Sequence, residues 1–108
     1  MTDRELLAYA AKAAGIKFYA LSRGGARYAP QPGIMQPYVY WNPLADDGDA
    51  LRLAVTLHLT VCVGLSGSTI VTDAFRNPLA VIQHDNDPDA TTRRVIVRAA
   101  AEIGRNMK

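Results

Sequence analysis

The sequence has little of what disulfides and metal centres require. Cys62 is the single cysteine among 108 residues, so an internal disulfide is excluded and a cysteine-rich zinc site lacks its ligands. Such cysteine usage is typical of a reducing compartment, and we expect the protein to act in the cytoplasm. Cys62 stands between Val61 and Val63, a pattern that predicts a buried and unreactive thiol in a strand.

A strong charge bias and long apolar runs are also lacking. The formal net charge is +2, which is too weak to indicate nucleic acid as a partner unless the cations cluster locally. The first 15 residues carry acids and a lysine among their apolar positions, unlike a signal peptide, and are too few to span a bilayer. We therefore expect no membrane partner and disfavour nucleic acid.

Recognisable catalytic and cofactor motifs are missing as well. Gly64 and Gly67 do not precede a helix, which excludes a phosphate-binding loop. The acids within residues 46–49 lack the remaining ligand spacing of a calcium hand. Neither histidine has a catalytic context, and we expect His58 in the core and His84 at the surface. The sequence thus predicts no catalytic residue, no metal and no cofactor.

What the sequence does contain is three helices with clear boundary signals. Thr2 and Glu5 form a capping box, and Gly15 supplies a stop for the first helix. Asp46 caps the second helix, and Asp87, followed by proline in the first helical position, caps the third. Apolar residues at helical spacing predict the buried sides, which are Leu6, Ala10 and Ala13, then Leu51, Val55 and His58, then Ile96, Ala100, Ile103 and Met107.

Short β-favouring segments separated by turns lie between these helices. The predicted strands are Ile16–Leu21, Ala26–Ala29, Tyr38–Trp41, Thr60–Gly64, Ser68–Thr72 and Leu79–Gln83, with a turn at Ser22–Gly25. Because Pro37 lacks an amide donor, we place Tyr38–Trp41 at a sheet edge or at the beginning of a strand. With 49% hydrophobic residues, residues 1–108 suit a single α+β domain, ordered helix, strands, helix, strands, helix, with antiparallel hairpins packed against three helices.

One four-residue segment occurs twice. Residues 42–45 and 77–80 both read Asn-Pro-Leu-Ala, each before an acidic segment that leads into a helix. Two related half-units would explain the repeat. Coincidence is the better explanation, because Asn-Pro favours turns in general and four common residues are a short match.

Aromatic residues beside arginines form the first candidate binding group. Aromatic rings can stack on bases while guanidinium groups bind phosphate. The group consists of Arg23, Arg27, Tyr28, Tyr38, Tyr40 and Trp41. Tyr38 and Tyr40 should share one face of a strand and Trp41 should leave from the other, so proximity in the sequence alone does not gather these rings in one site. The competing interpretation places most of them in the core or at its rim.

The last helix supplies the second candidate group. Arg94, Arg98 and Arg105 recur at helical intervals, with Arg93 close by, and could bind phosphate or an acidic protein. Glu102 can pair with Arg98, however, and exposed helix faces normally carry charge. We favour a solvated face over a dedicated site.

Two stretches, WNPLADDGDALRLAV and TTRRVIVRAAAEIGRNM, resemble small uncharacterised proteins of tailed phages and prophages. An aromatic residue with a nearby proline before a helix, together with an Ala-rich C-terminal helix, is distantly similar to the NinX-like phage group. The segments before Trp41 and between Asn77 and the last helix depart from that group, so its ligand residues do not transfer. The resemblance implies an accessory phage protein acting inside a bacterium and supplies no catalytic residue.

These observations lead to two main hypotheses. The first is a non-catalytic module that binds a bacterial host protein, modulating it or countering defence, through exposed aromatics with an arginine rim. The alternative is a binder that sequesters a nucleotide-type signal, with Tyr38, Tyr40 or Trp41 stacking and Arg23, Arg27 or Arg98 holding phosphate. An enzyme with an unrecognised site is a third hypothesis. Self-association through an edge strand or aromatic patch is a further expectation.

Overall fold

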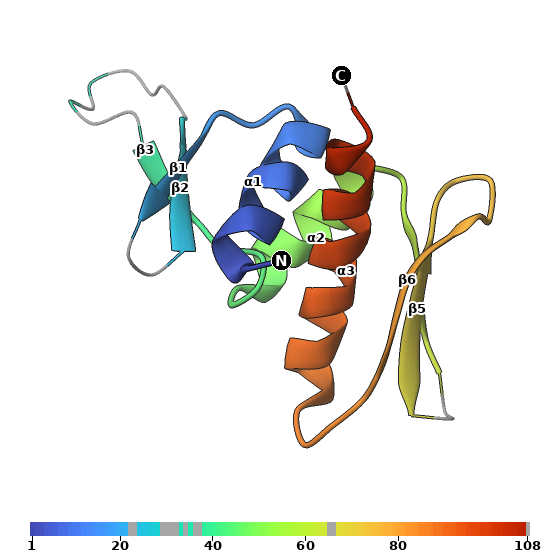
Figure 1. Cartoon of the computed structure of the whole chain (residues 1–108). Coiled ribbons are helices and arrows are strands. Elements are labelled where there is room, and N and C mark those ends of the chain that lie inside the picture. Colours follow the sequence, from blue (N-terminus) through green and yellow to red (C-terminus); the bar gives the residue numbers. More distant parts are fainter. Residues whose placement is uncertain (22–23, 29–32, 34, 36–37, 65–66, 108) are drawn as a thin grey trace.

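Three helices lie between two small antiparallel sheets (Figure 1). The computed structural model describes residues 1–21, 24–28, 33, 35, 38–64 and 67–107. Its elements are α1 (Asp3–Ala14), β1 (Phe18–Leu21), β2 (Gly24–Tyr28), β3 (Tyr38–Trp41), α2 (Asp47–Thr56), β4 (Thr60–Val63), β5 (Ser68–Thr72), β6 (Pro78–Gln83) and α3 (Pro88–Arg105). The predicted α+β class and the predicted order of helices and strands are confirmed.

The helices begin where the capping residues predict. Thr2, Asp46 and Asp87 each accept a hydrogen bond from the backbone amide three residues further on, at 3.2, 2.7 and 3.1 Å. These bonds satisfy amides that have no partner within the helix. Gly15 ends α1 with a left-handed φ of 71°, which glycine adopts without strain. Local sequence signals therefore determine the helix boundaries.

Helices α1 and α3 run parallel and form the centre of the molecule. Arg94 in the first half of α3 binds Asp3 at the start of α1 at 3.0 Å, and the Lys12 ammonium group near the end of α1 donates to the carbonyl of Met107, just beyond α3, at 3.1 Å. Gly104 lies at the closest point, where a β-carbon would overlap the Tyr9 carbonyl. Small residues let the two backbones approach, so this contact depends on glycine and alanine.

The buried sides of the helices differ in part from the predicted ones. In α2 the buried apolar residues are Ala50, Leu53 and Ala54, whereas Leu51 and Val55 are exposed. His58, predicted to lie in the core, follows the helix with a left-handed φ of 54° and is exposed. The helix therefore packs through the side opposite to much of the predicted stripe, since its position against α3 and Trp41 decides which side is covered.

Burial in α1 and α3 follows the predictions more closely. Leu6 and Ala10 of α1 are buried, and Ala13 is half-buried. In α3, Ile96 and Ala100 are buried and Ile103 is half-buried, but Met107 lies beyond the helix and is exposed. Helix α3 contacts α1, α2, β5 and β6, so its burial extends well beyond a single stripe.

Sheet A has the strand order β1-β2-β3. The predicted hairpin is confirmed, but Gly24 and Gly25 belong to β2 rather than to the turn, and Ala29 lies outside the described residues. Strand β3 is an edge strand, as Pro37 predicts. On the inner face, the rings of Phe18 and Trp41 pack edge to face with centroids 5.7 Å apart. These two rings anchor sheet A on the helices.

Sheet B has the strand order β4-β5-β6, and all three strands occur where they were predicted. Its central strand packs on α3 and fully buries Thr69 and Val71. Side chains alternate along a strand, so the residues next to Thr69 and Val71 point away from α3. Cys62, predicted to be buried, pairs with Ile70 on that outer face and is exposed, because the register of β4 turns its thiol away from α3.

The repeated Asn-Pro-Leu-Ala segments form different structures. In the first, the Asn42 side chain accepts a hydrogen bond from the Leu44 amide at 3.0 Å, and the turn leads into α2. In the second, residues 78–80 belong to strand β6. The repeat therefore marks no structural duplication. Within the described part of the chain, no helix is long and apolar enough to cross a membrane.

Candidate functional site

The outer face of sheet A carries a group of exposed aromatic side chains. Side chains alternate along each strand, and directly paired residues share a face. Tyr19 pairs with Ala26, Ala26 with Tyr40, and Tyr28 with Tyr38. The face that points away from the helices, here called the tyrosine face, consists of Tyr19, Leu21, Ala26, Tyr28, Tyr38 and Tyr40.

The rings of the tyrosine face support one another. Tyr38 contacts Tyr19 edge to face at 4.9 Å between centroids, and it contacts Tyr28 at 6.0 Å with an interplanar angle of 72°. Even so, the tyrosines in this face remain 43–54% exposed. A tyrosine has few rotatable bonds, so ring contacts of this kind hold the surface in a fixed shape at low entropic cost.

A shallow depression opens at the centre of the tyrosine face. Its floor is Ala26, which is only 7% exposed although it points outward, because Tyr19 and Tyr40 flank it on the neighbouring strands. Tyr19, Leu21, Tyr38 and Tyr40 form the walls of a cavity of about 470 Å³. This volume suits one or two apolar side chains of a partner.

The polar groups of this face lie at its border. The Lys17 ammonium group lies 5.7 Å from the centre of the Tyr28 ring, and the side-chain amide of Asn42 donates to the Tyr40 hydroxyl at 3.3 Å. Within the described strands, no charged residue belongs to the face itself. The arrangement is an uncharged aromatic centre with polar groups at its edge.

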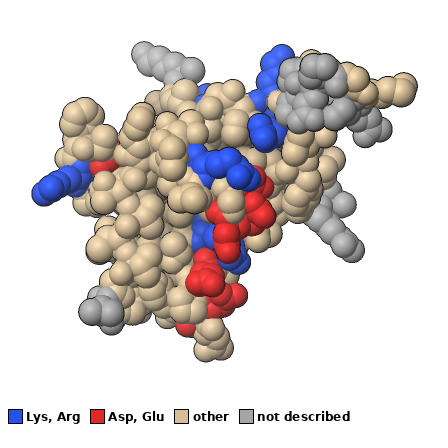
Figure 2. All heavy atoms as spheres, turned by 180° about the vertical axis from the view of Figure 1, so that it is seen from behind, with Lys and Arg blue, Asp and Glu red and all other residues tan. Residues whose placement is uncertain are grey.

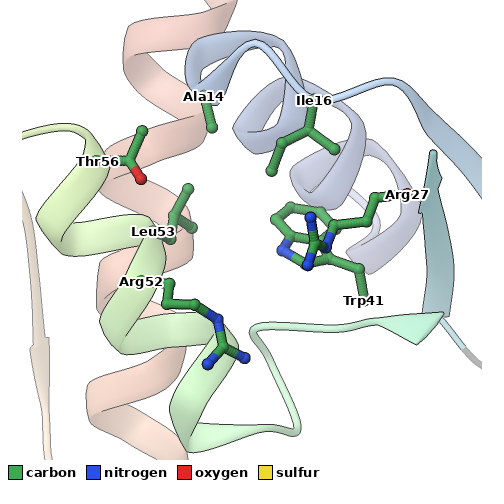
Figure 3. Close-up of a pocket in the computed structure, with 7 residues that line it drawn as sticks. All are labelled: Ala14, Ile16, Arg27, Trp41, Arg52, Leu53 and Thr56. Atoms are coloured by element: carbon green, nitrogen blue, oxygen red, sulfur yellow. The ribbon is translucent and has the colours of Figure 1, made fainter. Parts of the chain in front are cut away.

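Two of the predicted site residues lie on the inner face of sheet A instead. Trp41 is 3% exposed and belongs to the core, so it cannot act as a stacking platform at the surface. Its separation from Tyr38 and Tyr40 confirms the predicted alternation. Arg27 is half-buried and lines a pocket of about 200 Å³ together with Trp41 and Arg52 (Figure 3). Arg23 lies outside the described residues.

Two of the α3 arginines that were weighed as a binding stripe, Arg93 and Arg94, contact other helices. Arg93 binds Asp47 at 2.7 Å and the Leu44 carbonyl at 3.0 Å, which ties α3 to the start of α2. Arg94 binds Asp3 of α1. In both ion pairs the arginine joins α3 to another helix. In the face shown in Figure 2, basic and acidic side chains lie next to one another rather than forming a patch of one sign.

Two smaller predictions about charge are corrected at the same time. Glu102 pairs with Arg105 at 3.9 Å rather than with Arg98, which is exposed. His84 is half-buried, and its Nε2 atom lies 2.6 Å from the hydroxyl of the buried Thr69. The histidine expected at the surface is therefore the one tied into the protein, because β6 places it beside β5.

The sequence interpretation missed Tyr19 and Leu21. Their alternate positions in a predicted strand place them on one face, but the pairing that brings this face to Tyr38 and Tyr40 is a register that the sequence does not state. Tyr28 was recognised as an aromatic candidate and does join the face. The structure thus brings Tyr19 together with the three tyrosines that were candidates from the sequence.

The titratable groups with clear shifts lie away from sheet A. Hydrogen bonds from the Asn77 side chain and backbone lower the pKa of Asp73, with a further bond from the Phe75 amide. The Asp87 amide and the Thr91 hydroxyl lower the pKa of Asp85. In the described part of the chain, no three His, Cys, Asp or Glu residues are arranged to hold a metal ion.

Comparisons with family models, curated proteins and solved structures found no match to this chain. The phage resemblance therefore stays a prediction.

Proposed function

We propose that the protein is a binding module that recognises an extended apolar segment of a partner protein through its tyrosine face. The observation that carries the proposal is the cluster of four exposed tyrosines around the depression above Ala26. Aromatic centres that lack charge and have a polar border are typical of energetically important parts of protein interfaces.

The charge distribution favours a protein segment over a nucleic acid. A nucleic-acid platform needs cations along the path of the phosphates as well as aromatic rings for the bases. At the tyrosine face, Lys17 is the cation with a contact among the described residues, while Arg93 and Arg94 are engaged elsewhere. A partner with apolar side chains uses the rings and the depression without needing a basic track.

The setting in which this module works is also a proposal. On the resemblance to phage and prophage proteins, the partner is a protein of the bacterial host and the encounter takes place in the host cytoplasm. The module would then act by occupying a host surface rather than by catalysis. The lone cysteine fits a reducing compartment, which agrees with this location.

A random peptide display library, selected on the purified protein, tests the proposal. We expect enrichment of peptides with apolar or proline residues. The best of them should bind the Tyr38→Ala variant at least roughly tenfold more weakly, since a buried aromatic anchor commonly contributes about 2 kcal/mol or more. Phe75→Ala is the matched control, because Phe75 is an exposed aromatic residue outside the tyrosine face and its removal should leave affinity unchanged.

Two results would contradict the proposal. One is equal binding of the selected peptides by wild type and Tyr38→Ala, with Tyr19→Ala giving the same answer. The other is a stable dimer in analytical ultracentrifugation that dissociates on Tyr38→Ala, because the tyrosine face would then be covered by a second copy of the chain.

A further inference from the structure

Arg27 points from the central strand of sheet A toward the helices, on the side opposite the tyrosine face. Its direct neighbours across the sheet are Phe18 on β1 and Val39 on β3. Neither can accept a hydrogen bond through its side chain. The strand register therefore places the Arg27 guanidinium group beside apolar side chains of the neighbouring strands.

Three described arginines are half-buried, and their partners differ. Arg93 binds Asp47 and Arg94 binds Asp3, each at 3.0 Å or less. For Arg27, no hydrogen bond or ion pair with a protein group is found within the described residues. A guanidinium group that has lost part of its hydration is normally stabilised by an anion, and no described carboxylate of the protein supplies one for Arg27.

The pocket beside Arg27 offers an explanation. It has a volume of about 200 Å³ and lies between sheet A, the end of α1 and helix α2 (Figure 3). Its walls are Ala14, Ile16, Arg27, Trp41, Arg52, Leu53 and Thr56. None of these residues is acidic, and Arg27 and Arg52 give the lining two positive charges.

Other donors line the same pocket. The Trp41 indole nitrogen has no hydrogen bond within the described residues. Every fully buried side-chain nitrogen or oxygen among these residues, by contrast, has a hydrogen-bond partner. The indole nitrogen is therefore not sealed off from solvent, although the residue as a whole is nearly buried. The Thr56 hydroxyl is a second neutral donor on the α2 wall.

Arg52 contributes less charge than Arg27 does. Its guanidinium binds the carboxylate of Asp49 at 2.8 Å and lies 3.8 Å from that of Asp46. Those carboxylates offset much of its field, whereas no described acid does so for Arg27. Arg27 should therefore supply the main contact to an anion, and Arg52 a weaker one from the opposite wall.

We propose that this pocket binds a tetrahedral oxyanion of phosphate size, held chiefly by the Arg27 guanidinium. A planar guanidinium binds two oxygens of such a group at once, and the pocket admits the group without a nucleoside attached. The anion is either inorganic phosphate or the phosphate of an ester whose remainder lies outside the pocket. The site is independent of the tyrosine face, since the two lie on opposite sides of sheet A.

The single tryptophan of the chain reports on the site directly. Trp41 lines the pocket, so its fluorescence should change saturably when inorganic phosphate is titrated into the full-length protein. Chloride at equal ionic strength controls for screening. Parallel titrations with phosphoserine peptide and with adenosine monophosphate identify the source, because an ester that binds more tightly than inorganic phosphate is the better ligand.

Variants of Arg27 separate binding at the pocket from general charge attraction. Arg27→Gln should weaken phosphate binding by roughly tenfold or more, and Arg27→Lys should weaken it less, because a lysine keeps the charge and loses the paired donors. Circular dichroism confirms that each variant is folded. Arg98→Gln removes an exposed cation outside the pocket and should leave the titration unchanged.

The proposal is overturned if wild type shows no saturable change with any of the three phosphate compounds. It is also overturned if Arg98→Gln weakens binding as much as Arg27→Gln does, because the attraction would then be nonspecific. Retention of full affinity in folded Arg27→Gln would have the same meaning. None of these results bears on peptide binding at the tyrosine face.

Discussion

Sheets A and B have the same number and order of strands but use their faces differently. Each has three antiparallel strands in consecutive order, and they lie on opposite sides of the helices (Figure 1). Sheet B buries the middle of β5 on α3, with Thr69 and Val71 fully enclosed. Sheet A packs on α1 through β1 and β2 with the Phe18–Trp41 ring pair on its inner face, and its outer face presents tyrosines.

The difference shows how support and recognition are divided in this small domain. Sheet B contacts α3 along two strands, so its attachment is spread over many small and medium side chains. In sheet A the Phe18–Trp41 ring pair is one large contact beside the packing of β1 and β2 on α1, and the opposite face presents the tyrosines. We therefore expect single substitutions to affect sheet A more sharply than sheet B.

The largest expected effect comes from removing the anchor of sheet A. Trp41→Ala should lower the free energy of unfolding by about 3–5 kcal/mol, the range typical of a buried aromatic truncated to alanine. Urea denaturation followed by circular dichroism measures the loss. Hydrogen exchange should show that β1–β3 lose protection first, while β4–β6 keep theirs at low denaturant.

Val71→Ala is the matched change in sheet B. We expect a loss of about 1–2 kcal/mol, because a smaller side chain is shortened at a site supported by many neighbours. If the two variants lose equal stability, or if Trp41→Ala exposes both sheets together, the proposed contrast in anchoring is wrong.

A smaller effect is expected where β3 joins α2. Asp49 is only 7% exposed. Its carboxylate accepts hydrogen bonds from the backbone amide of Asn42 at 3.0 Å and from the Arg52 guanidinium at 2.8 Å. Asp49→Asn removes the charge and should cost about 1–3 kcal/mol in thermal or urea unfolding. Asp89→Asn, at an exposed acid in the first turn of α3, should change stability little.

Acid below the ordinary carboxyl pKa of 3.8 should act on sheet B rather than on sheet A. The pKa values of Asp73 and Asp85 lie below the ordinary 3.8, because backbone and side-chain donors favour the charged carboxylates. Their stabilisation is therefore complete above about pH 3.8 and is lost as the pH falls through the lowered values. Amide NMR spectra recorded as the pH falls below the ordinary 3.8 should therefore report this loss around the β5–β6 turn and the β6–α3 connection rather than in β1–β3.

Asn77→Ala supplies the control for the acid experiment. It removes the side-chain donor that lowers the pKa of Asp73 most strongly, so the turn should titrate nearer the ordinary value. Spectral changes that begin in β1–β3, or an Asp73 titration unaffected by Asn77→Ala, would show that the acid response has another origin.

The smallest expected effect concerns Cys62 on the outer face of sheet B. The thiol is exposed, so a thiol reagent should modify it in the folded protein without a change in the circular dichroism spectrum. Cys62→Ser should alter the unfolding free energy by less than about 0.5 kcal/mol. A thiol that reacts only after denaturation would indicate that β4 is covered.

The sequence was a reliable guide where structure is determined locally. Thr2, Asp46 and Asp87 cap helices because an oxygen of each side chain lies within reach of a nearby amide. Pro37 predicts an edge strand because it lacks an amide donor, and Tyr38–Trp41 indeed lies at an edge. Strand alternation also separates Trp41 from Tyr38 and Tyr40 correctly.

The errors concern choices that packing makes between distant segments. Helix α2 carries apolar residues around much of its circumference, so only its contact with α3 and sheet A selects Leu53 over Leu51. Cys62 lies in an apolar strand whose pairing decides which residues face α3. The tyrosine face depends on two strand registers, and a shift of one residue in either would have dispersed it.

The most direct test of the proposed recognition surface is an amide NMR titration of the labelled protein with the best selected peptide. We predict that the largest chemical-shift changes fall on Tyr19, Ala26, Tyr38 and Tyr40, with β4–β6 unchanged. Changes centred on sheet B or on the exposed side of α2, with the tyrosine face unaffected, would contradict it.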